Sequence, residues 1–184
     1  TDRKSTGIIQ TGASFSDKND EIWFVTDKDN EFQRLATLNL STKKVIYYTS
    51  KIPWNVENYI LSEDKKTIGF VTNEAGLNKM YLMKASDKSY AAVKNIPIGL
   101  IGGGAFTKDN QQLFFTQSTA QTASDVYKLN LATGAIQRWT ESELGEMQQS
   151  DMALPKFIEW KSFDNLKISG FYYPAAAKFI GKRP

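Results

Sequence analysis

A repeat of about 45 residues runs through most of this 184-residue chain and constrains its fold more than any other feature. Ser16, Ser62 and Thr107 stand 46 and 45 residues apart, each follows a large apolar residue, and each opens a polar turn. Six residues after each of them an apolar stretch begins. The phenylalanines in the same place of the three stretches are Phe24, Phe70 and Phe115. A period of this length indicates that each repeat forms one supersecondary unit.

Each unit is predicted to contain four short strands joined by turns. The units are rich in β-branched and aromatic residues, and no stretch keeps the 3.6-residue period of an amphipathic helix. The second strand of every unit is apolar at consecutive positions, which favours a sheet that is covered on both faces by neighbours. Four-stranded sheets stacked face to face, with a repeat of this length, are typical of β-propeller blades.

The predicted fold class is therefore all-β, a partial β-propeller of about three four-stranded antiparallel blades. The units span about residues 11–52, 53–98 and 99–142, and a linker completes a propeller part that covers residues 1–154. Because a closed propeller needs about four blades or more, three units form only an arc of one.

The absence of histidine and cysteine excludes several kinds of chemistry. It rules out a Ser/His/Asp or Cys/His nucleophile, a zinc site of the usual ligands, thiol redox chemistry and disulfides. The net charge is only +3, and the positive excess lies after Pro155, so the nearly neutral body predicts no nucleic-acid partner. No apolar run reaches the roughly 18 residues that a membrane helix needs, so no membrane partner is predicted.

Five stretches together carry a family resemblance. They are IPWNVE at 52–57, VTNEAG at 71–76, SDVY at 124–127, RWTESE at 138–143 and LPKFIEWKSFDNLKISGFYYP at 154–174. They resemble the propeller, and the crossing from its last blade into the hydrolase domain, of bacterial prolyl oligopeptidase family serine peptidases of the acylaminoacyl-peptidase and dipeptidyl-peptidase type. One departure is Asn165, where the family usually has glycine; asparagine also tolerates left-handed backbone, so the predicted hairpin keeps its turn.

The resemblance implies that residues 155–184 begin an α/β-hydrolase domain, incomplete here, and that the chain is truncated before that domain's catalytic residues. The parent enzyme is expected to hydrolyse short peptides or acyl-peptides through a serine ester, with the propeller as steric gate and chamber wall. This segment is then predicted to be inactive, with no catalytic, cofactor-binding or metal-binding residue. Arg34 and Glu57 are the candidates for contact with peptide in the chamber, and the alternative is that both are exposed strand-end charges.

Three other features favour structural interpretations. The glycine-rich stretch 99–104 lacks the Gly-Lys-Ser/Thr and following helix of a phosphate loop, and it is predicted to be an inner strand where small residues permit close approach. The acidic stretch 27–31 lacks the glycine and distal glutamate of a calcium loop. Trp23 is predicted to lie in the core, and Trp54 and Trp139 are predicted to pack between units.

Two other function classes stay open from the sequence. The first is a stand-alone propeller that binds or scaffolds other molecules without enzymatic activity. The second, a hydrolase that uses carboxylates or a metal, is disfavoured because no paired-carboxylate motif is present. An arc leaves sheet faces and strand edges uncovered, so the chain is expected to self-associate, with two arcs forming a ring-like pair. Compartment is not determined by the sequence, with the periplasm slightly favoured over the cytoplasm.

Overall fold

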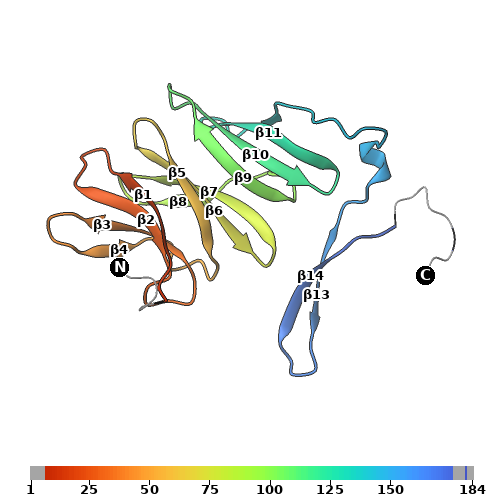
Figure 1. Ribbon diagram of the computed structural model, residues 1–184, viewed down its shortest axis with the longest axis horizontal. Coiled ribbons are helices and arrows are strands. Elements are labelled where there is room, and N and C mark those ends of the chain that lie inside the picture. Colours follow the sequence, from red (N-terminus) through yellow and green to blue (C-terminus); the bar gives the residue numbers. More distant parts are fainter. Residues whose placement is uncertain (1–6, 176–180, 182–184) are drawn as a thin grey trace.

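The computed structural model describes residues 7–175 and 181, in which three four-stranded antiparallel sheets follow one another and a two-stranded hairpin ends the fold (Figure 1). Sheet 1 consists of β1 (Gln10–Phe15), β2 (Glu21–Thr26), β3 (Arg34–Asn39) and β4 (Val45–Tyr47). Sheet 2 consists of β5 (Val56–Leu61), β6 (Thr67–Glu74), β7 (Leu77–Lys84) and β8 (Tyr90–Ala92). Sheet 3 consists of β9 (Leu100–Phe106), β10 (Gln112–Thr119), β11 (Thr122–Asn130) and β12 (Ile136–Arg138). Each sheet is a simple meander, so its strands pair in chain order.

A short connection with one turn of 3-10 helix (Gln149–Asp151) leads from sheet 3 to the hairpin of β13 (Lys156–Lys161) and β14 (Lys167–Tyr172). The hairpin register runs from the pair Lys156 and Tyr172 to the pair Lys161 and Lys167. Asn165 lies in its turn with a φ of 66°, as the sequence predicts for a position where glycine is common. The described part of the chain holds no helix with the length and apolarity that a membrane crossing requires.

The repeat seen in the sequence corresponds to repeated geometry in the three sheets. The turn between the first and second strands has a left-handed residue at the same position in each sheet: Asn19, Lys65 and Asn110, with φ between 54° and 57°. In the same turns a hydroxyl group donates to an aspartate: Ser16 to Asp20, Ser62 to Asp64 and Thr107 to Asp109. These local bonds explain why Ser or Thr recurs at this place in every unit.

The first strands of successive sheets, β1, β5 and β9, contact one another and are here called the inner strands. Each inner strand has a β-bulge where its pairing with the second strand shifts: between Thr11 and Ser14, at Glu57, and between Ile101 and Gly104. A β-bulge bends a strand and redirects the side chain of the extra residue. In β9 the close neighbour of Gly104 belongs to β10 of the same sheet rather than to another sheet, because a Cβ there would lie 2.5 Å from the carbonyl oxygen of Phe114. A Cβ on Gly103 would meet nothing within 4 Å.

Two hydrophobic cores join the sheets. The first lies between sheets 1 and 2 and includes Trp23, Leu35, Ile68, Phe70 and Met83, each 1% exposed or less. The second lies between sheets 2 and 3. Its most completely buried members are Leu113, Phe115 and Leu129. Each core is the seam between two stacked sheets, as the continuous apolar second strands predict.

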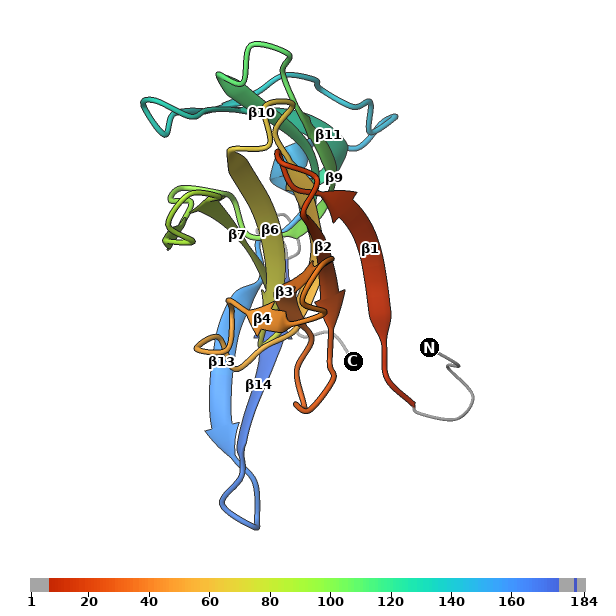
Figure 2. The same cartoon turned by 90° about the vertical axis from the view of Figure 1, so that its left-hand side faces the viewer.

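This architecture confirms the predicted fold class, because three blade-like sheets, each an antiparallel meander, stack side by side around their inner strands (Figure 1). Figure 2 looks along the stack from the side of sheet 1, and the hairpin extends beyond one end of the sheets. The division of the chain at residue 154 into a propeller part and the start of another domain stays a prediction.

Candidate functional site

The turns between second and third strands, the connections between sheets and the hairpin all lie at the same end of the molecule, here called the hairpin face. A cavity of about 330 Å³ lies there between sheets 2 and 3 and the hairpin. It is lined by Gly76, Ile98, Gly99, Leu100, Ser118, Thr119, Ala120, Pro155, Phe171 and Tyr173. The lining is mostly apolar, and its polar side-chain groups are the hydroxyls of Ser118, Thr119 and Tyr173.

Gly76 and Phe171 form the wall where the hairpin touches sheet 2. Gly76 has a φ of 89°, in the left-handed region, and a Cβ at this position would lie 2.9 Å from Cε2 of Phe171. Both the backbone and the contact therefore require glycine. Phe171 is held in turn by Phe157 on the paired strand, with ring centroids 5.8 Å apart.

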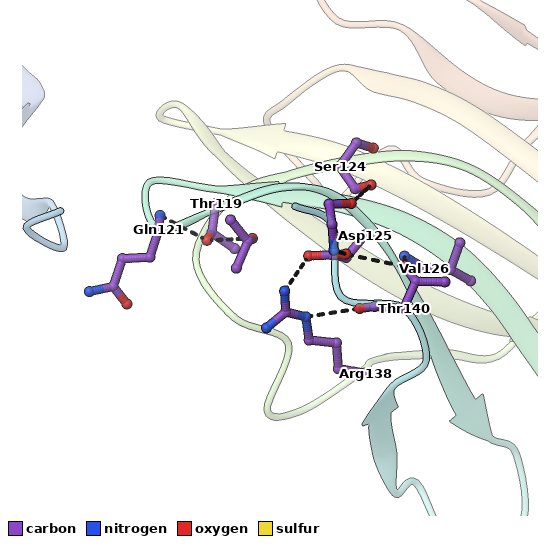
Figure 3. Close-up of polar contacts among 9 residues, drawn as sticks. Thr119, Gln121, Ser124, Asp125, Val126, Arg138 and Thr140 are labelled. Atoms are coloured by element: carbon purple, nitrogen blue, oxygen red, sulfur yellow. Dashed lines mark hydrogen bonds and ion pairs between the residues drawn. The ribbon is translucent and has the colours of Figure 1, made fainter. Parts of the chain in front are cut away.

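A buried carboxylate lies at the same face, in sheet 3 (Figure 3). Asp125 is 0% exposed, and Arg138 donates from Nη2 to its Oδ2 over 2.7 Å. The backbone N–H of Ser142 donates to Oδ1 over 2.7 Å, and the Thr140 hydroxyl donates to the same oxygen over 3.2 Å. Burial alone raises the pKa of Asp125, but these hydrogen bonds outweigh it and hold the pKa below its usual value. Asp125 therefore anchors the chain where it leaves β12 toward the hairpin.

Asp125 occupies the same repeat position as Arg34 in sheet 1 and Lys79 in sheet 2. Across the second and third strands, Arg34 pairs with Thr26, Lys79 with Thr72 and Asp125 with Gln117. The three partners, Thr26, Thr72 and Gln117, are all 0% exposed. Each sheet thus has a pair of polar residues at this end of its second and third strands, and the charged member is a cation in sheets 1 and 2 and an anion in sheet 3.

In sheet 2, Lys79 belongs to a small hydrogen-bond network around Glu74. Its carboxylate accepts hydrogen bonds from Lys79 Nζ over 2.6 Å, from the Tyr81 hydroxyl over 2.6 Å and from the Thr72 hydroxyl over 3.1 Å. Burial raises the pKa of Glu74, and the bonds from Lys79 and Tyr81 lower it further than burial raises it. Burial and the neighbouring carboxylate together raise the pKa of Tyr81 well above its usual value.

The structure places Arg34 inside sheet 1. Only 8% of it is exposed, its guanidinium carbon lies 3.9 Å from the centre of the Tyr47 ring, and it donates to the carbonyl oxygen of Lys28. Its Nε is buried and has no hydrogen-bond partner within the described residues. Arg34 is therefore not an exposed strand-end charge, and its contact with peptide stays a prediction.

Glu57 lies in the bulge of the inner strand β5 and is exposed. Its carboxylate accepts a hydrogen bond from Asn78 Nδ2 over 2.9 Å, while Asn78 Oδ1 accepts one from the backbone N–H of Ile101. A hydrogen bond from the Val56 N–H to the Gln33 carbonyl oxygen joins the backbones next to Glu57 and Arg34. The side chains of these two candidates have different partners. No other Asp, Glu, Lys or Arg lies on the inner strands, so Glu57 is their one such charge.

The sequence did not single out the Asp125 network or the contact between Gly76 and Phe171. A signal for the first exists in the aligned repeat, where position 125 carries aspartate while positions 34 and 79 carry cations. Trp139, predicted to pack between units, is 57% exposed, and within the described residues its ring contacts are with Phe114 and Lys128 of its own sheet. In the described residues no three acidic side chains are grouped so as to hold a metal ion.

Comparison with known proteins supports the fold and leaves the family open. No family model and no curated protein matches the sequence. Among solved structures, the puromycin-hydrolysing peptidase of Mycobacterium tuberculosis matches with a TM-score of 0.72 and 10% identity over 96% of this chain and 28% of its own. Prolyl oligopeptidase B from Galerina marginata matches with a TM-score of 0.70 and 11% identity over 89% and 23%. TolB from Acinetobacter baumannii matches with a TM-score of 0.58 and 17% identity over 90% and 44%.

The structural class is therefore a β-propeller arc, and the matched parts of these neighbours are propeller domains. Several neighbours are peptidases, which is consistent with an origin of this segment in such an enzyme. The chain spans between about a fifth and less than half of the length of the neighbours it matches. Identities of 10–17% establish a common fold and nothing finer.

Proposed function

We propose that this chain is a propeller segment of a serine peptidase of the prolyl oligopeptidase type, in which it forms part of the wall and steric gate of the substrate chamber. The observation that carries the proposal is the hairpin of β13 and β14. It follows the third sheet, does not continue the repeat, and lies next to sheets 2 and 3 at the cavity. Peptidases among the structural neighbours support the same assignment.

The hairpin has the surface expected of strands that begin another domain. One of its faces carries Ile158, Trp160, Ile168 and Tyr172, which are 43%, 47%, 38% and 53% exposed. The other face carries Phe157 and Phe171 together with a surface ion pair between Glu159 and Lys167. A hairpin that exposes so much apolar surface to water is only marginally stable by itself. Further strands and helices of a hydrolase domain would cover this surface.

The proposed gate depends on the rigidity of the stacked sheets and on the size of the substrate. Stacked sheets joined by continuous cores cannot separate to admit a folded protein, but an extended peptide can enter between them and the hydrolase domain. The catalytic serine, its base and the oxyanion hole would belong to that domain, because this chain has no histidine to activate a nucleophile. The segment alone is then inactive, and its contribution is selection of short substrates.

The cavity under the hairpin lies where the propeller and the hydrolase domain would meet. Its apolar lining suits uncharged side chains of a peptide. Glu57, as the one Asp, Glu, Lys or Arg of the inner strands, is the group that would distinguish cationic from neutral peptide ends. Arg34 would act indirectly, because its guanidinium is buried against Tyr47.

The test uses the natural polypeptide that contains this segment. Its reading frame should encode a Gly-x-Ser-x-Gly motif and a histidine downstream of Pro184, and the purified protein should cleave acyl-amino-acid or dipeptide chromogenic substrates. A peptide series of increasing length should show a sharp fall in rate, and the same sequence placed in a folded domain should resist cleavage. Equal cleavage of short peptides and folded proteins would refute the steric gate.

The second candidate is a binding propeller without a hydrolase. The observation that favours it is the match to TolB, a neighbour that is not named as a peptidase and whose match also covers 90% of this chain. A natural reading frame without a hydrolase domain, and a purified protein whose hairpin face captures a partner without any turnover, would support this candidate over the first.

A further inference from the structure

A second cavity, of about 170 Å³, lies in the core between sheets 2 and 3 and is here called the seam cavity. It is distinct from the cavity under the hairpin. Its wall consists of apolar side chains of the second core, from β5, β6, β7 and β10: Ile60, Val71, Met80, Leu113 and Phe115. All of these except Ile60 are 5% exposed or less. Strands on both sides of the seam bound the cavity, so it is a gap inside the core rather than part of an uncovered face.

The repeat shows what is missing from this place. In the seam between sheets 1 and 2 it is filled by two aromatic rings, Trp23 of β2 and Tyr59 of β5. The Tyr59 hydroxyl donates to the carbonyl oxygen of Trp23 over 2.7 Å, so the two residues are in direct contact. One sheet further on, the same two repeat positions are Gly69 and Gly104, and both line the seam cavity. The cavity is thus the space that aromatic rings occupy in the other seam.

The space that remains has the size of one ring. Ile60 stands at the repeat position of Ser14 and refills part of the gap, since its Cγ1 would lie 3.3 Å from a Cβ on Gly69. Apolar cavities of about 150 Å³ stay dry and accept benzene. Aromatic rings and thioether sulfurs, here those of Phe115 and Met80, interact favourably with an aromatic guest. The wall therefore suits an aromatic ring better than water.

The seam cavity opens toward the inner strands. Its exposed lining residues are Asn58 of β5 and Gly102, Gly103 and Gly104 of β9. A Cβ on Gly103 would meet nothing within 4 Å, and the backbone there is outside the left-handed region, so the described residues do not require glycine at this position. The missing side chain keeps the mouth open. Sheets added to a propeller extend the ring around its axis and leave the inner strands facing the central channel.

The edge of β9 is suited to a peptide backbone. β9 is the last strand of its sheet and, within the described chain, pairs with β10 alone. An extended peptide can add to such an edge through main-chain hydrogen bonds while its side chains enter adjacent pockets. The three successive glycines 102–104 let another backbone come close, and Asn58 presents an exposed amide at the mouth.

We infer that the seam cavity binds one aromatic side chain of a peptide that lies along β9. The ring passes between Asn58 and Gly103 and fills the space that corresponds to the rings of Trp23 and Tyr59 in the other seam. A peptide as the source of the ring rests on the proposed function, whereas the fit of the cavity to a ring does not. The segment then selects peptides that carry phenylalanine or tyrosine.

The first test measures the binding of a single ring, 4-fluorotoluene, to the protein by methyl NMR. The methyl signals of Met80 and Leu113 report it, because both side chains line the seam cavity and neither lines the cavity under the hairpin. We expect saturable shifts with a dissociation constant of about 1 mM or tighter.

Ile60→Phe places a ring inside the seam cavity and should weaken the binding of 4-fluorotoluene by about tenfold or more. The matched control is Ile46→Phe, the same change at a position of β4 that is 40% exposed. The control should leave the dissociation constant within a factor of about two. Equal weakening by both variants, or no weakening by Ile60→Phe, would overturn the assigned site.

Val71→Ala keeps the test decisive if Ile60→Phe does not fold. It enlarges the seam cavity, so the affinity for 2-fluoronaphthalene relative to 4-fluorotoluene should rise by about fivefold. A variant that has lost its fold cannot show this gain. An unchanged ratio in a folded Val71→Ala protein would contradict binding in the seam cavity.

The second test asks whether the ring comes from a peptide. Acetyl-Ala-Phe-Ala-amide should shift the same methyl signals and bind roughly tenfold more tightly than 4-fluorotoluene, because backbone pairing along β9 adds to the contact of the ring. The peptide with leucine at the centre should bind about fivefold more weakly than the phenylalanine peptide. The peptide with alanine there should leave the signals unchanged.

The outcomes separate the parts of the inference. Binding of 4-fluorotoluene without binding of the phenylalanine peptide would overturn the peptide as occupant, and equal binding of the leucine peptide would overturn the aromatic preference. Absence of binding by every probe would overturn the site. All of these signals report binding, so peptidase activity without them would leave the proposed function standing, and binding without turnover would leave the inference standing.

Discussion

Cε2 of Phe171 in the hairpin lies where a Cβ on Gly76, in the turn of sheet 2, would come within 2.9 Å of it. This contact joins two segments almost 100 residues apart and sets the position of the hairpin against the propeller face. Its geometry depends on a residue without a side chain in a left-handed backbone.

Replacement of Gly76 by alanine is expected to destabilise the fold through backbone strain and through the contact with Phe171. Gly134→Ala is the matched control, because its φ of 71° imposes similar strain while a Cβ there meets nothing within 4 Å. The control should cost about 1 kcal/mol, and Gly76→Ala should cost measurably more in urea unfolding. The excess should disappear in a Phe171→Ala background, and an unchanged excess there would contradict the contact.

Asp125→Asn should be among the most destabilising polar substitutions in this chain. It removes the carboxylate of an ion pair in which Asp125 is 0% exposed, and it leaves the Arg138 guanidinium without a charged partner. The free energy of unfolding should fall by on the order of 3 kcal/mol. Glu159→Gln breaks the pair with Lys167 on the exposed hairpin and should cost less than about 1 kcal/mol. Similar unfolding midpoints for the two variants would show that the buried ion pair does not stabilise the fold more than the exposed one.

Stability should fall in acid because the pKa values of Asp125 and Glu74 are lowered by folding. The unfolded chain then binds more protons, so stability is complete above the ordinary values of 3.8 and 4.5 and is lost as the pH decreases below them. Urea midpoints between pH 6 and pH 2 measure this loss. Asp125→Asn should flatten the profile below about pH 4, and a profile parallel to the wild type would contradict the lowered pKa of Asp125.

Tyr59→Phe tests a hydrogen bond between the first two sheets. The Tyr59 hydroxyl in β5 donates to the Trp23 carbonyl in β2 over 2.7 Å and lies 3.2 Å from the Ser14 hydroxyl. Removal of the donor should cost about 1 kcal/mol in thermal or urea unfolding. Tyr172→Phe, at a residue 53% exposed on the hairpin, is the control and should be nearly neutral. An equal loss in both variants would mean that the bond does not stabilise the seam.

Much of the fold could be predicted from the sequence because its causes are local. The period of about 45 residues, the Ser or Thr that opens each first turn and the apolar second strands all follow from short-range patterns. The turn at Asn165 was predictable for the same reason, since asparagine adopts left-handed backbone without a partner elsewhere.

The side-chain partners of the candidate site were not predictable in this way. Arg34 reads as a strand-end charge, yet the structure buries it against Tyr47, 13 residues further along the chain. Trp139 reads as packing between units, yet it is exposed on the surface of its own sheet. In both cases the environment of the side chain depends on which strand or sheet lies beside it. The neighbouring residues in the sequence do not determine that.

The sequence by itself determined that the chain forms three similar antiparallel sheets and ends in a hairpin of different pattern, because strand and turn formation depend on side chains within a few residues. Only the tertiary structure decided which repeat positions become the buried pair of Asp125 and Arg138, where the bulge directs Glu57, and which apolar faces stay open. Those properties depend on the stacking of whole sheets, in which one position of the repeat is core in the middle of the stack and surface at its ends.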